Sequence, residues 1–394
     1  PEINELDNRA QPICRPLFSH SSLPNVLELT EVQTENFTFD RPFSYFVHVH
    51  HNQPLWAKNL DVIPTKILDE VRKGNCKLIF DNTLEGKSIN GDKFLNPFYE
   101  SIDKLKLPTK NIYFITNNLV AEKTHQEYHR ADKINVISVM WNVFDIQRLI
   151  EQEDLPNEVS VDMEYKYKSV NIFKTKHFLK INRTNRNERD IFLLFLNFEK
   201  LLDKCLVSFP ELHKWPEYPE MFYKYIQKEN INDLKTKLPF DIDETDETNH
   251  GPAGVGEGFF DADLAFNPIH YRNSFISIVM GAFAFDKDGY HLHSSTFNPM
   301  YCGHPIIQFA PYKTLEVMKQ YGFKTFDKWW DESYDNEKDD WKRLQMIMDL
   351  VLEISEYDKK DLLHMYEDMK ETLQHNISVL ENYDIKTNLY DRIF

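Results

Sequence analysis

Short apolar runs alternate with amphipathic stretches in the first half of the chain, after a polar opening segment without clear periodicity. The runs are rich in β-branched and aromatic residues, and they predict strands at Tyr45–Val49, Lys77–Phe80, Ile112–Thr116 and Asn135–Val139. Amphipathic stretches at Pro64–Lys73 and Phe98–Leu105 predict helices between them. Buried strands that alternate with helices are typical of βαβ units and of a parallel sheet.

A second set of apolar runs repeats this pattern further along the chain. The predicted strands are His177–Ile181, Leu206–Phe209, Ser274–Met280 and Ile306–Phe309, and the predicted helices are Arg189–Leu202, Thr314–Tyr321 and Trp341–Ser355. We therefore expect an α/β protein with two doubly wound, Rossmann-like domains that face each other across a cleft. In such sheets ligands bind at the carboxyl ends of the strands.

The pattern also suggests domain boundaries. We predict an N-terminal arm over residues 1–43, a first α/β domain over 44–160, a second over 170–355, and a C-terminal helix and tail over 356–394 that pack at the domain junction. Within the last segment, Lys359–Leu380 has the periodicity of one long amphipathic helix.

Composition narrows the class of protein. No run is apolar enough to span a bilayer and no signal peptide is evident, so we expect a cytoplasmic protein without membrane insertion. The four cysteines are far apart, which disfavours disulfides and zinc. The formal net charge of −17 disfavours a nucleic-acid partner. His48 and His50 alternate without a carboxylate at ligand spacing, so no metal site is expected.

Three side chains in the first domain are candidates for a catalytic base. Asp81 follows the predicted strand Lys77–Phe80, Glu85 lies in the loop beyond it, and His51 follows the first strand. A carboxylate at a strand's carboxyl end can deprotonate an acceptor hydroxyl. A turn or helix-capping Asp is an equally good interpretation of Asp81. We rank Asp81 first, Glu85 second and His51 third.

A basic run joins a strand to a helix in the second domain. Residues 180–189 read K-I-N-R-T-N-R-N-E-R and contain Arg183 and Arg186. Forked guanidinium donors beside a helix N-terminus suit a diphosphate. The alternative is a solvated helix start.

A hydroxyl-rich segment precedes the last strand. Ser294, Ser295 and Thr296, followed by Asn298, precede a helix-like stretch and could hydrogen-bond a phosphate or a ribose. The alternative is that they only cap the helix.

Several segments resemble a group of phage-encoded, GT-B-like glycosyltransferases. The most specific is G-F-K-T-F-D-K-W-W-D-E-S-Y-D, which ends at Asp335. The looser ones are I-L-D-E-V-R-K-G-N-C-K-L-I-F-D-N-T-L-E-G from Ile67, F-L-K-I-N-R-T-N-R-N-E-R from Phe178, S-F-I-S-I-V from Ser274 and S-T-F-N-P-M-Y-C-G-H-P-I-I from Ser295. Together they cover most of residues 44–355.

The resemblance implies that the C-terminal domain holds a nucleotide-sugar donor and the N-terminal domain the acceptor. Arg183 and Arg186 match the family's basic strand-end motif. Thr296, Phe297 and Pro299 match its T-E-K-T-F-K-P-I element. Gly281 and Ser294 stand where the family has acidic residues. These departures favour either a different donor or a member that no longer catalyses transfer.

The expected function is transfer of a sugar from a nucleotide sugar to an acceptor hydroxyl, with no cofactor beyond that co-substrate. The acceptor would be a hydroxymethylated pyrimidine in phage DNA, which places the protein in the host cytoplasm, or a surface glycan. A sugar- or nucleotide-binding protein without catalysis is the alternative. A structural protein of nucleic acid is disfavoured by the negative charge.

Overall fold

The computed structural model describes residues 42–49, 60–83, 86–143, 147, 175–182, 186–212, 218–240, 268–281 and 284–394. The chain forms two compact units. The first comprises Pro1–Arg148, Asp286–Leu292 and Tyr383–Phe394, and the second comprises Leu149–Phe285 and His293–Asn382. The chain therefore returns twice to its first unit.

The first unit contains a parallel sheet of four strands in consecutive order: β1(Phe43–His48), β2(Cys76–Asn82), β3(Ile112–Thr116) and β4(Asn135–Ser138). These strands confirm the sequence prediction to within two residues. The helices of this unit are α3(Thr65–Lys73), α4(Asn96–Lys104) and α5(Ala121–Glu127). Because parallel crossovers are right-handed, consecutive order puts the connecting helices on one face of the sheet. Among the described strands, the reversal expected of a doubly wound sheet does not occur here.

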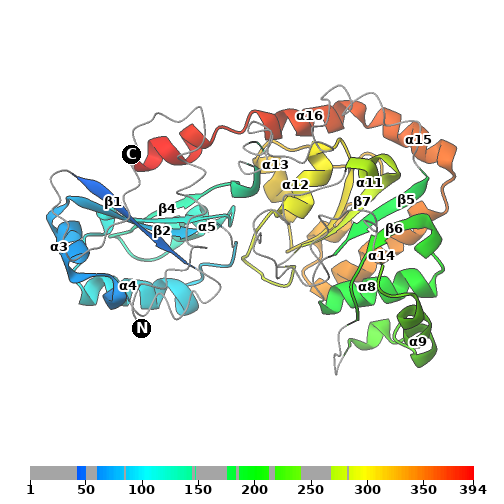
Figure 1. Cartoon of the computed structure of the whole chain (residues 1–394), viewed down its shortest axis with the longest axis horizontal. Helices are drawn as coiled ribbons and strands as arrows, with labels where there is room; N and C mark the ends of the chain where they lie inside the picture. Colours follow the sequence, from blue (N-terminus) through cyan, green and yellow to red (C-terminus); the bar gives the residue numbers. More distant parts are fainter. Residues whose placement is uncertain are drawn as a thin grey trace. The chain divides into compact units, whose positions relative to one another are not determined.

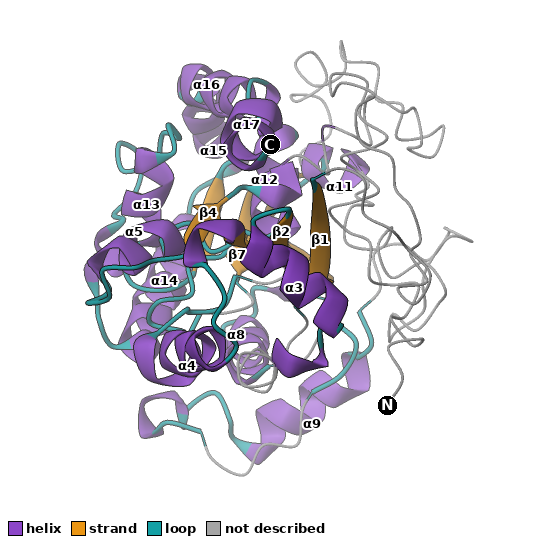
Figure 2. Ribbon diagram, turned by 90° about the vertical axis from the view of Figure 1, so that its left-hand side faces the viewer, coloured by secondary structure: helices purple, strands orange, loops and turns teal. Residues whose placement is uncertain are grey.

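The helix-covered face is a continuous apolar core. Helix α3 buries Ile67 and Val71 in the same cluster as Leu78 and Phe80 of β2, and Figure 2 shows this helix crossing the strands. It ends at Gly74, whose positive φ of 85° suits a residue without a Cβ.

The C-terminal segment of the first unit covers the opposite face of its sheet. Alternate residues of β2, β3 and β4 point to this face, and they form one buried cluster with the segment: Ile79, Ile115, Ile137, Ile385, Leu389 and Ile393. Polar contacts join the segment to the sheet, since Met140 N donates to Tyr383 Oη over 2.9 Å and Lys77 Nζ donates to Ile393 O. Residues that are distant in sequence therefore complete this sheet.

The second unit contains a parallel sheet in the order β6-β5-β7-β8: β5(Lys176–Ile181), β6(Cys205–Ser208), β7(Ser274–Met280) and β8(Ile306–Phe309). The strand order reverses between β5 and β7, as in a doubly wound sheet. These strands also lie within one residue of the sequence prediction.

Helices cover both faces of this second sheet (Figure 1). One group is α8(Asn187–Phe198), α9(Lys228–Lys237) and α14(Asp340–Ser355), and the other is α11(Pro268–Arg272), α12(Ser294–Tyr301), α15(Lys359–Asp368) and α16(Lys370–Glu381). The predicted single helix Lys359–Leu380 is thus two helices, which meet at Met369.

The remaining helices are short. They are α13(Thr314–Gln320) and α17(Asp391–Ile393), with the 3-10 or π segments η2(Leu60–Val62), η3(Gly91–Leu95), η4(Thr109–Asn111), η5(Leu202–Lys204), η6(Glu220–Phe222), η7(Ser333–Asn336) and η8(Lys386–Tyr390).

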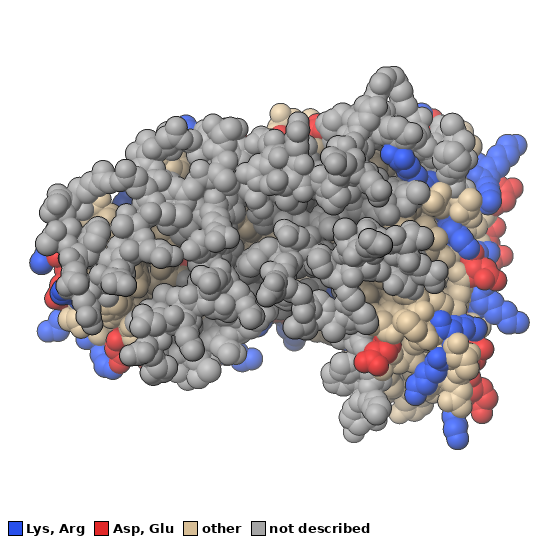
Figure 3. Space-filling model, in the orientation of Figure 1, with Lys and Arg blue, Asp and Glu red and all other residues tan. Residues whose placement is uncertain are grey.

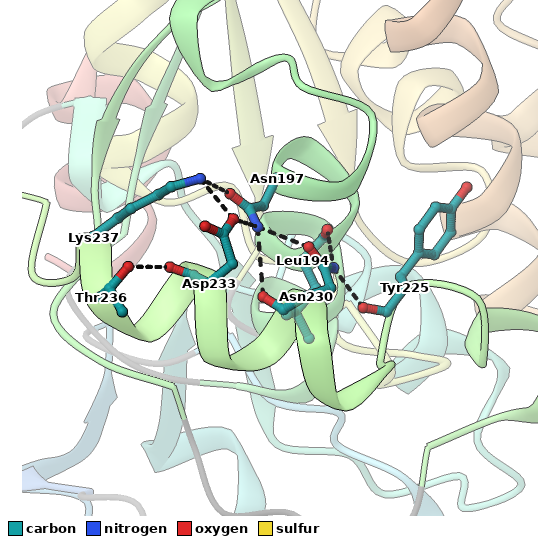
Figure 4. Close-up of polar contacts among 7 residues, drawn as sticks. All are labelled: Leu194, Asn197, Tyr225, Asn230, Asp233, Thr236 and Lys237. Carbon is teal, nitrogen blue, oxygen red and sulfur yellow. Dashed lines mark hydrogen bonds and ion pairs between the residues drawn. The ribbon is translucent and has the colours of Figure 1, made fainter.

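A polar cluster joins α8 to α9 (Figure 4). Asn197 Nδ2 donates to Asn230 Oδ1 over 2.7 Å and to Asp233 Oδ2 over 2.8 Å. Asn230 Nδ2 donates to the carbonyls of Leu194 and Tyr225 over 2.9 and 2.6 Å. The side-chain amides are therefore matched to acceptors, which allows them to be buried without a large penalty. This cluster fixes α9 on the outer side of α8.

Substitution of Leu389 by Ala tests how strongly the first unit depends on its C-terminal segment. Leu389 is fully buried in the cluster with Ile79 and Ile115. Its truncation removes apolar contact and leaves a cavity, so we expect a loss of roughly 2–4 kcal/mol in the free energy of unfolding. Urea unfolding followed by circular dichroism measures this loss. The exposed Lys386→Ala substitution is the control, and equal stability of the two variants would contradict the assignment.

Candidate functional site

The reversal of strand order in the second sheet defines a place where a ligand can bind. At such a point the chain leaves neighbouring strands toward opposite faces, which opens a crevice at their carboxyl ends. Here the strands are β5 and β7. Helix α8 follows β5, and α12 runs back between the end of β7 and the start of β8. Both helices therefore begin at the carboxyl edge of the sheet, on opposite faces.

Arg186 lies at this edge. It is the residue that precedes α8, and its carbonyl accepts hydrogen bonds from Arg189 N and Asp190 N over 3.1 and 2.9 Å. Its side chain is partly exposed. The position agrees with the predicted strand-to-helix junction, and a role in donor binding stays a prediction. Arg183 lies outside the described residues.

The first turn of α8 buries three ionisable side chains, which are Glu188, Arg189 and Asp190. Arg189 Nη2 donates to the carbonyl of Met280, the last residue of β7, over 2.8 Å. This hydrogen bond connects the first turn of α8 to the end of β7, at the point where the strand order reverses. Burial, followed by the charge of Arg186, lowers the pKa of Arg189 to about 10, and burial raises the pKa of Glu188. Sequence reasoning quoted Arg189 within the basic run but gave it no role.

The hydroxyl-rich segment forms the first turn of α12 rather than a loop before a helix. The capping residue is His293, whose Nδ1 accepts from Ser295 N over 3.5 Å and lies 2.8 Å from Ser294 Oγ. The expectation that the hydroxyls cap the helix is therefore corrected, because His293 takes that position. Ser294, Thr296 and Asn298 are buried and Ser295 is exposed.

Gly281 follows β7 at the same edge. Its N–H donates to Phe309 O over 2.8 Å, and a Cβ at this position would lie 3.2 Å from that oxygen. Such a contact is tighter than usual, so an acidic residue here would require a shift of the backbone. The close approach of β7 and β8 thus accounts for a glycine at a position where the resemblance leads one to expect an acid.

Asp81 lies inside β2, whose last residue is Asn82. Its side chain is 4% exposed, and Oδ1 accepts from Thr83 N over 3.0 Å and from Thr83 Oγ1 over 2.8 Å. This is the turn-stabilising arrangement expected of Asp at a strand end. Glu85 and His51 lie outside the described residues.

Two asparagines that sequence reasoning missed line the same edge of the first sheet. Asn117 and Asn118 directly follow β3. Asn118 Nδ2 donates to the carbonyls of Lys87 and Asp288 over 3.1 and 2.7 Å. The contact with Asp288 fixes the returning segment 286–292 against the sheet. An Asn-Asn pair after a buried strand is the only sequence signal for this role.

His291 belongs to the returning segment and packs against the loop after β2. It forms a bridge with Asn118, and its Nε2 lies 3.0 Å from Asn117 Nδ2. A Cβ on Gly86 would lie 2.3 Å from the His291 Cβ, so only glycine fits there. The edge that contains Asp81 is therefore built jointly by three separated segments of the chain.

The described part of the chain contains no group of three or more metal-ligating side chains, and none of its helices is long and apolar enough to cross a membrane. On the face drawn in Figure 3, basic and acidic side chains are interspersed over the described surface of the second unit.

Comparison with known proteins does not assign the chain to a family. No protein-family model matches it, and no curated protein is significantly similar to it.

The pH dependence of stability tests the burial of Lys180 on β5. This side chain is 0% exposed, and burial, followed by the charge of Arg189, lowers its pKa from 10.5 to about 7. Between these values the unfolded chain binds the additional proton, so the protein loses stability as the pH falls from about 10 to about 7. Relative to Lys180→Met, we expect the wild type to lose roughly 2–4 kcal/mol over this range.

Urea unfolding of the two proteins at a series of pH values measures this difference. Lys180→Met has no group that titrates at this position, so its profile reports all other groups. Parallel profiles would mean that Lys180 has an ordinary pKa in the folded state.

Proposed function

We propose that this protein is a GT-B-like glycosyltransferase, in which the second unit binds a nucleotide-sugar donor and the first unit carries the acceptor side. The observation that supports this most is the reversal of strand order between β5 and β7, with cationic side chains at its carboxyl edge. A diphosphate needs donors and positive charge in such a crevice.

The proposed roles of Arg186 and of the α12 residues follow from their positions, and the role of Arg183 follows from the sequence motif. Arg186 and the N–H groups at the start of α8 would hold the diphosphate, together with Arg183. Ser294, Ser295, Thr296 and Asn298 on α12 would contact phosphate or ribose. The sugar would pass to a hydroxyl of a hydroxymethylated pyrimidine in phage DNA or of a surface glycan. The net charge of −17 favours the glycan.

A nucleotide- or sugar-binding protein without catalysis is the second candidate. Two observations favour it. Oδ1 of Asp81 is engaged with Thr83, and an acidic residue in place of Gly281 would require a shift of the backbone at β7 and β8. In this alternative, the protein still binds the donor but has no catalytic base.

Donor binding is tested with a panel of nucleotide sugars. A ligand that binds only the folded protein raises its melting temperature, so a thermal-shift screen identifies the donor. With that donor, Arg186→Ala should weaken binding by roughly 1.5–3 kcal/mol, which is the scale of a charge-assisted hydrogen bond. Titration calorimetry measures the loss, and the exposed Lys235→Ala on α9 is the control for a lost positive charge. Equal affinities would reject Arg186 as a donor ligand.

Catalysis by Asp81 is tested with Asp81→Asn. The Asn oxygen can still accept from Thr83, so the turn is kept and only the base is lost. Turnover should fall by about a hundredfold or more while donor affinity is unchanged. Asp92→Asn, at an exposed position of the same unit, is the control. Full turnover in Asp81→Asn would direct the search to Glu85 and His51, and absence of turnover in the wild type would favour the binding protein.

A further inference from the structure

The amine of Lys180 is buried without a polar partner. Lys180 is the penultimate residue of β5, its side chain is fully buried, and Nζ has no hydrogen-bond acceptor among the described residues. Its neighbours are aromatic. Nζ lies 5.1 Å from the ring centre of Phe192 on α8 and 5.9 Å from that of Phe209 beyond β6. The side chain therefore lies between the sheet and the middle of α8, next to the end of β6.

Charged groups surround this amine, but none of them pairs with it. From α8, Arg189 disfavours its protonation, whereas Glu188 and Asp190 favour it. From β6, only the thiol of Cys205 contributes. None of these carboxylates forms an ion pair with Nζ. A lysine that retained its charge here would lose more hydration than its contacts with the two aromatic rings return. Because burial lowers the pKa of Lys180 to about 7, the amine is mainly neutral in the ligand-free protein at about pH 8.

Two further polar groups at the same junction lack partners. Asn182 Nδ2, just after β5, and Asn187 Oδ1, in the first turn of α8, are buried without a hydrogen bond among the described residues. Buried polar groups are nearly always satisfied in native proteins. Three unsatisfied groups within eight residues, from the end of β5 to the first residue of the 12-residue helix α8, indicate a missing polar ligand rather than isolated defects.

We infer that Lys180 is a proton-linked anchor for the anionic group of the ligand, and that it takes up a proton when a phosphate binds at the carboxyl end of β5. This inference rests on the proposed function for the identity of the ligand, and it extends that function to the mechanism of binding. The neutral amine receives one proton from solvent and becomes an ammonium group. A phosphate oxygen then accepts a hydrogen bond from that group. No covalent bond is made or broken in the ligand.

The position of Lys180 permits this change. Only Ile181 separates it from the end of β5, a distance of about 3.3 Å along the strand. The flexible four-carbon stem is longer than this rise, so the ammonium group can move from the aromatic rings to the carboxyl edge. The uncharged form is stable between the rings, and the charged form gains a partner at the edge.

The test is calorimetric titration of the full chain with inorganic pyrophosphate at about pH 8. Each titration is performed in two buffers of different ionisation enthalpy, which yields the number of protons taken up. The wild type is compared with Lys180→Met. The control is Lys176→Met, which changes a lysine on the same strand and the same face, whose Nζ donates to Asp203 O over 2.6 Å. Any change in the protonation of pyrophosphate itself contributes equally to the proton uptake measured with all three proteins.

We expect Lys180→Met to bind pyrophosphate at least tenfold more weakly and to take up at least about half a proton less than the wild type. Lys176→Met should match the wild type in both respects. Circular dichroism establishes that Lys180→Met is folded, which is expected because a methionine fits a buried, aromatic site. Equal affinity and equal proton uptake in the wild type and Lys180→Met would overturn the inference. Absence of pyrophosphate binding to the wild type would overturn it as well.

The nucleotide-sugar panel separates this inference from the proposed function. Pyrophosphate binding that depends on Lys180, without binding of any nucleotide sugar, would support the anchor and reject the glycosyltransferase. Nucleotide-sugar turnover that is the same in the wild type and Lys180→Met, with equal proton uptake, would reject the anchor alone.

Discussion

A parallel sheet buries both of its faces, and in the first unit this requirement determines how the chain is routed. Consecutive strand order puts α3, α4 and α5 on one side, which leaves the other side apolar and uncovered. Residues 383–394 provide the missing layer. The segment 286–292 returns in the same way to the carboxyl edge, where Asn118 holds it. The surroundings of Asp81 therefore exist only when segments from three parts of the sequence have assembled.

The second unit satisfies the same requirement differently. Its strand order reverses, so local helices cover both faces and the reversal leaves a polar edge. The bond from Arg189 to Met280 spans this edge and fixes the start of α8 relative to β7. Burying Glu188 and Arg189 in the first turn of α8, and Lys180 on the neighbouring strand β5, is costly unless a ligand or a change of protonation compensates. Stability alone would favour apolar residues here, which is why we connect these charges with binding.

Most of the fold could be predicted from the sequence. The eight strands were found because each is a compact apolar run bounded by polar residues, as in Ser274–Met280. The sheet that the C-terminal segment covers was not predicted, since the apolar pattern of Ile385, Leu389 and Ile393 does not specify their partner. The candidate site was partly predicted. Arg186 was placed correctly at a strand-to-helix junction, but the cap formed by His293 was missed because histidine is an uncommon capping residue.

The return of the chain has a consequence for biosynthesis. β4 ends at Ser138 and the covering segment begins at Tyr383, so a ribosome must translate the whole second unit before the first can be completed. During that interval Ile79, Ile115 and Ile137 present an apolar sheet face to the cell. Exposed faces of this kind bind chaperones and promote aggregation. Nascent chains that terminate before residue 383 would consequently be recognised as incomplete, even though every strand of the first sheet is present.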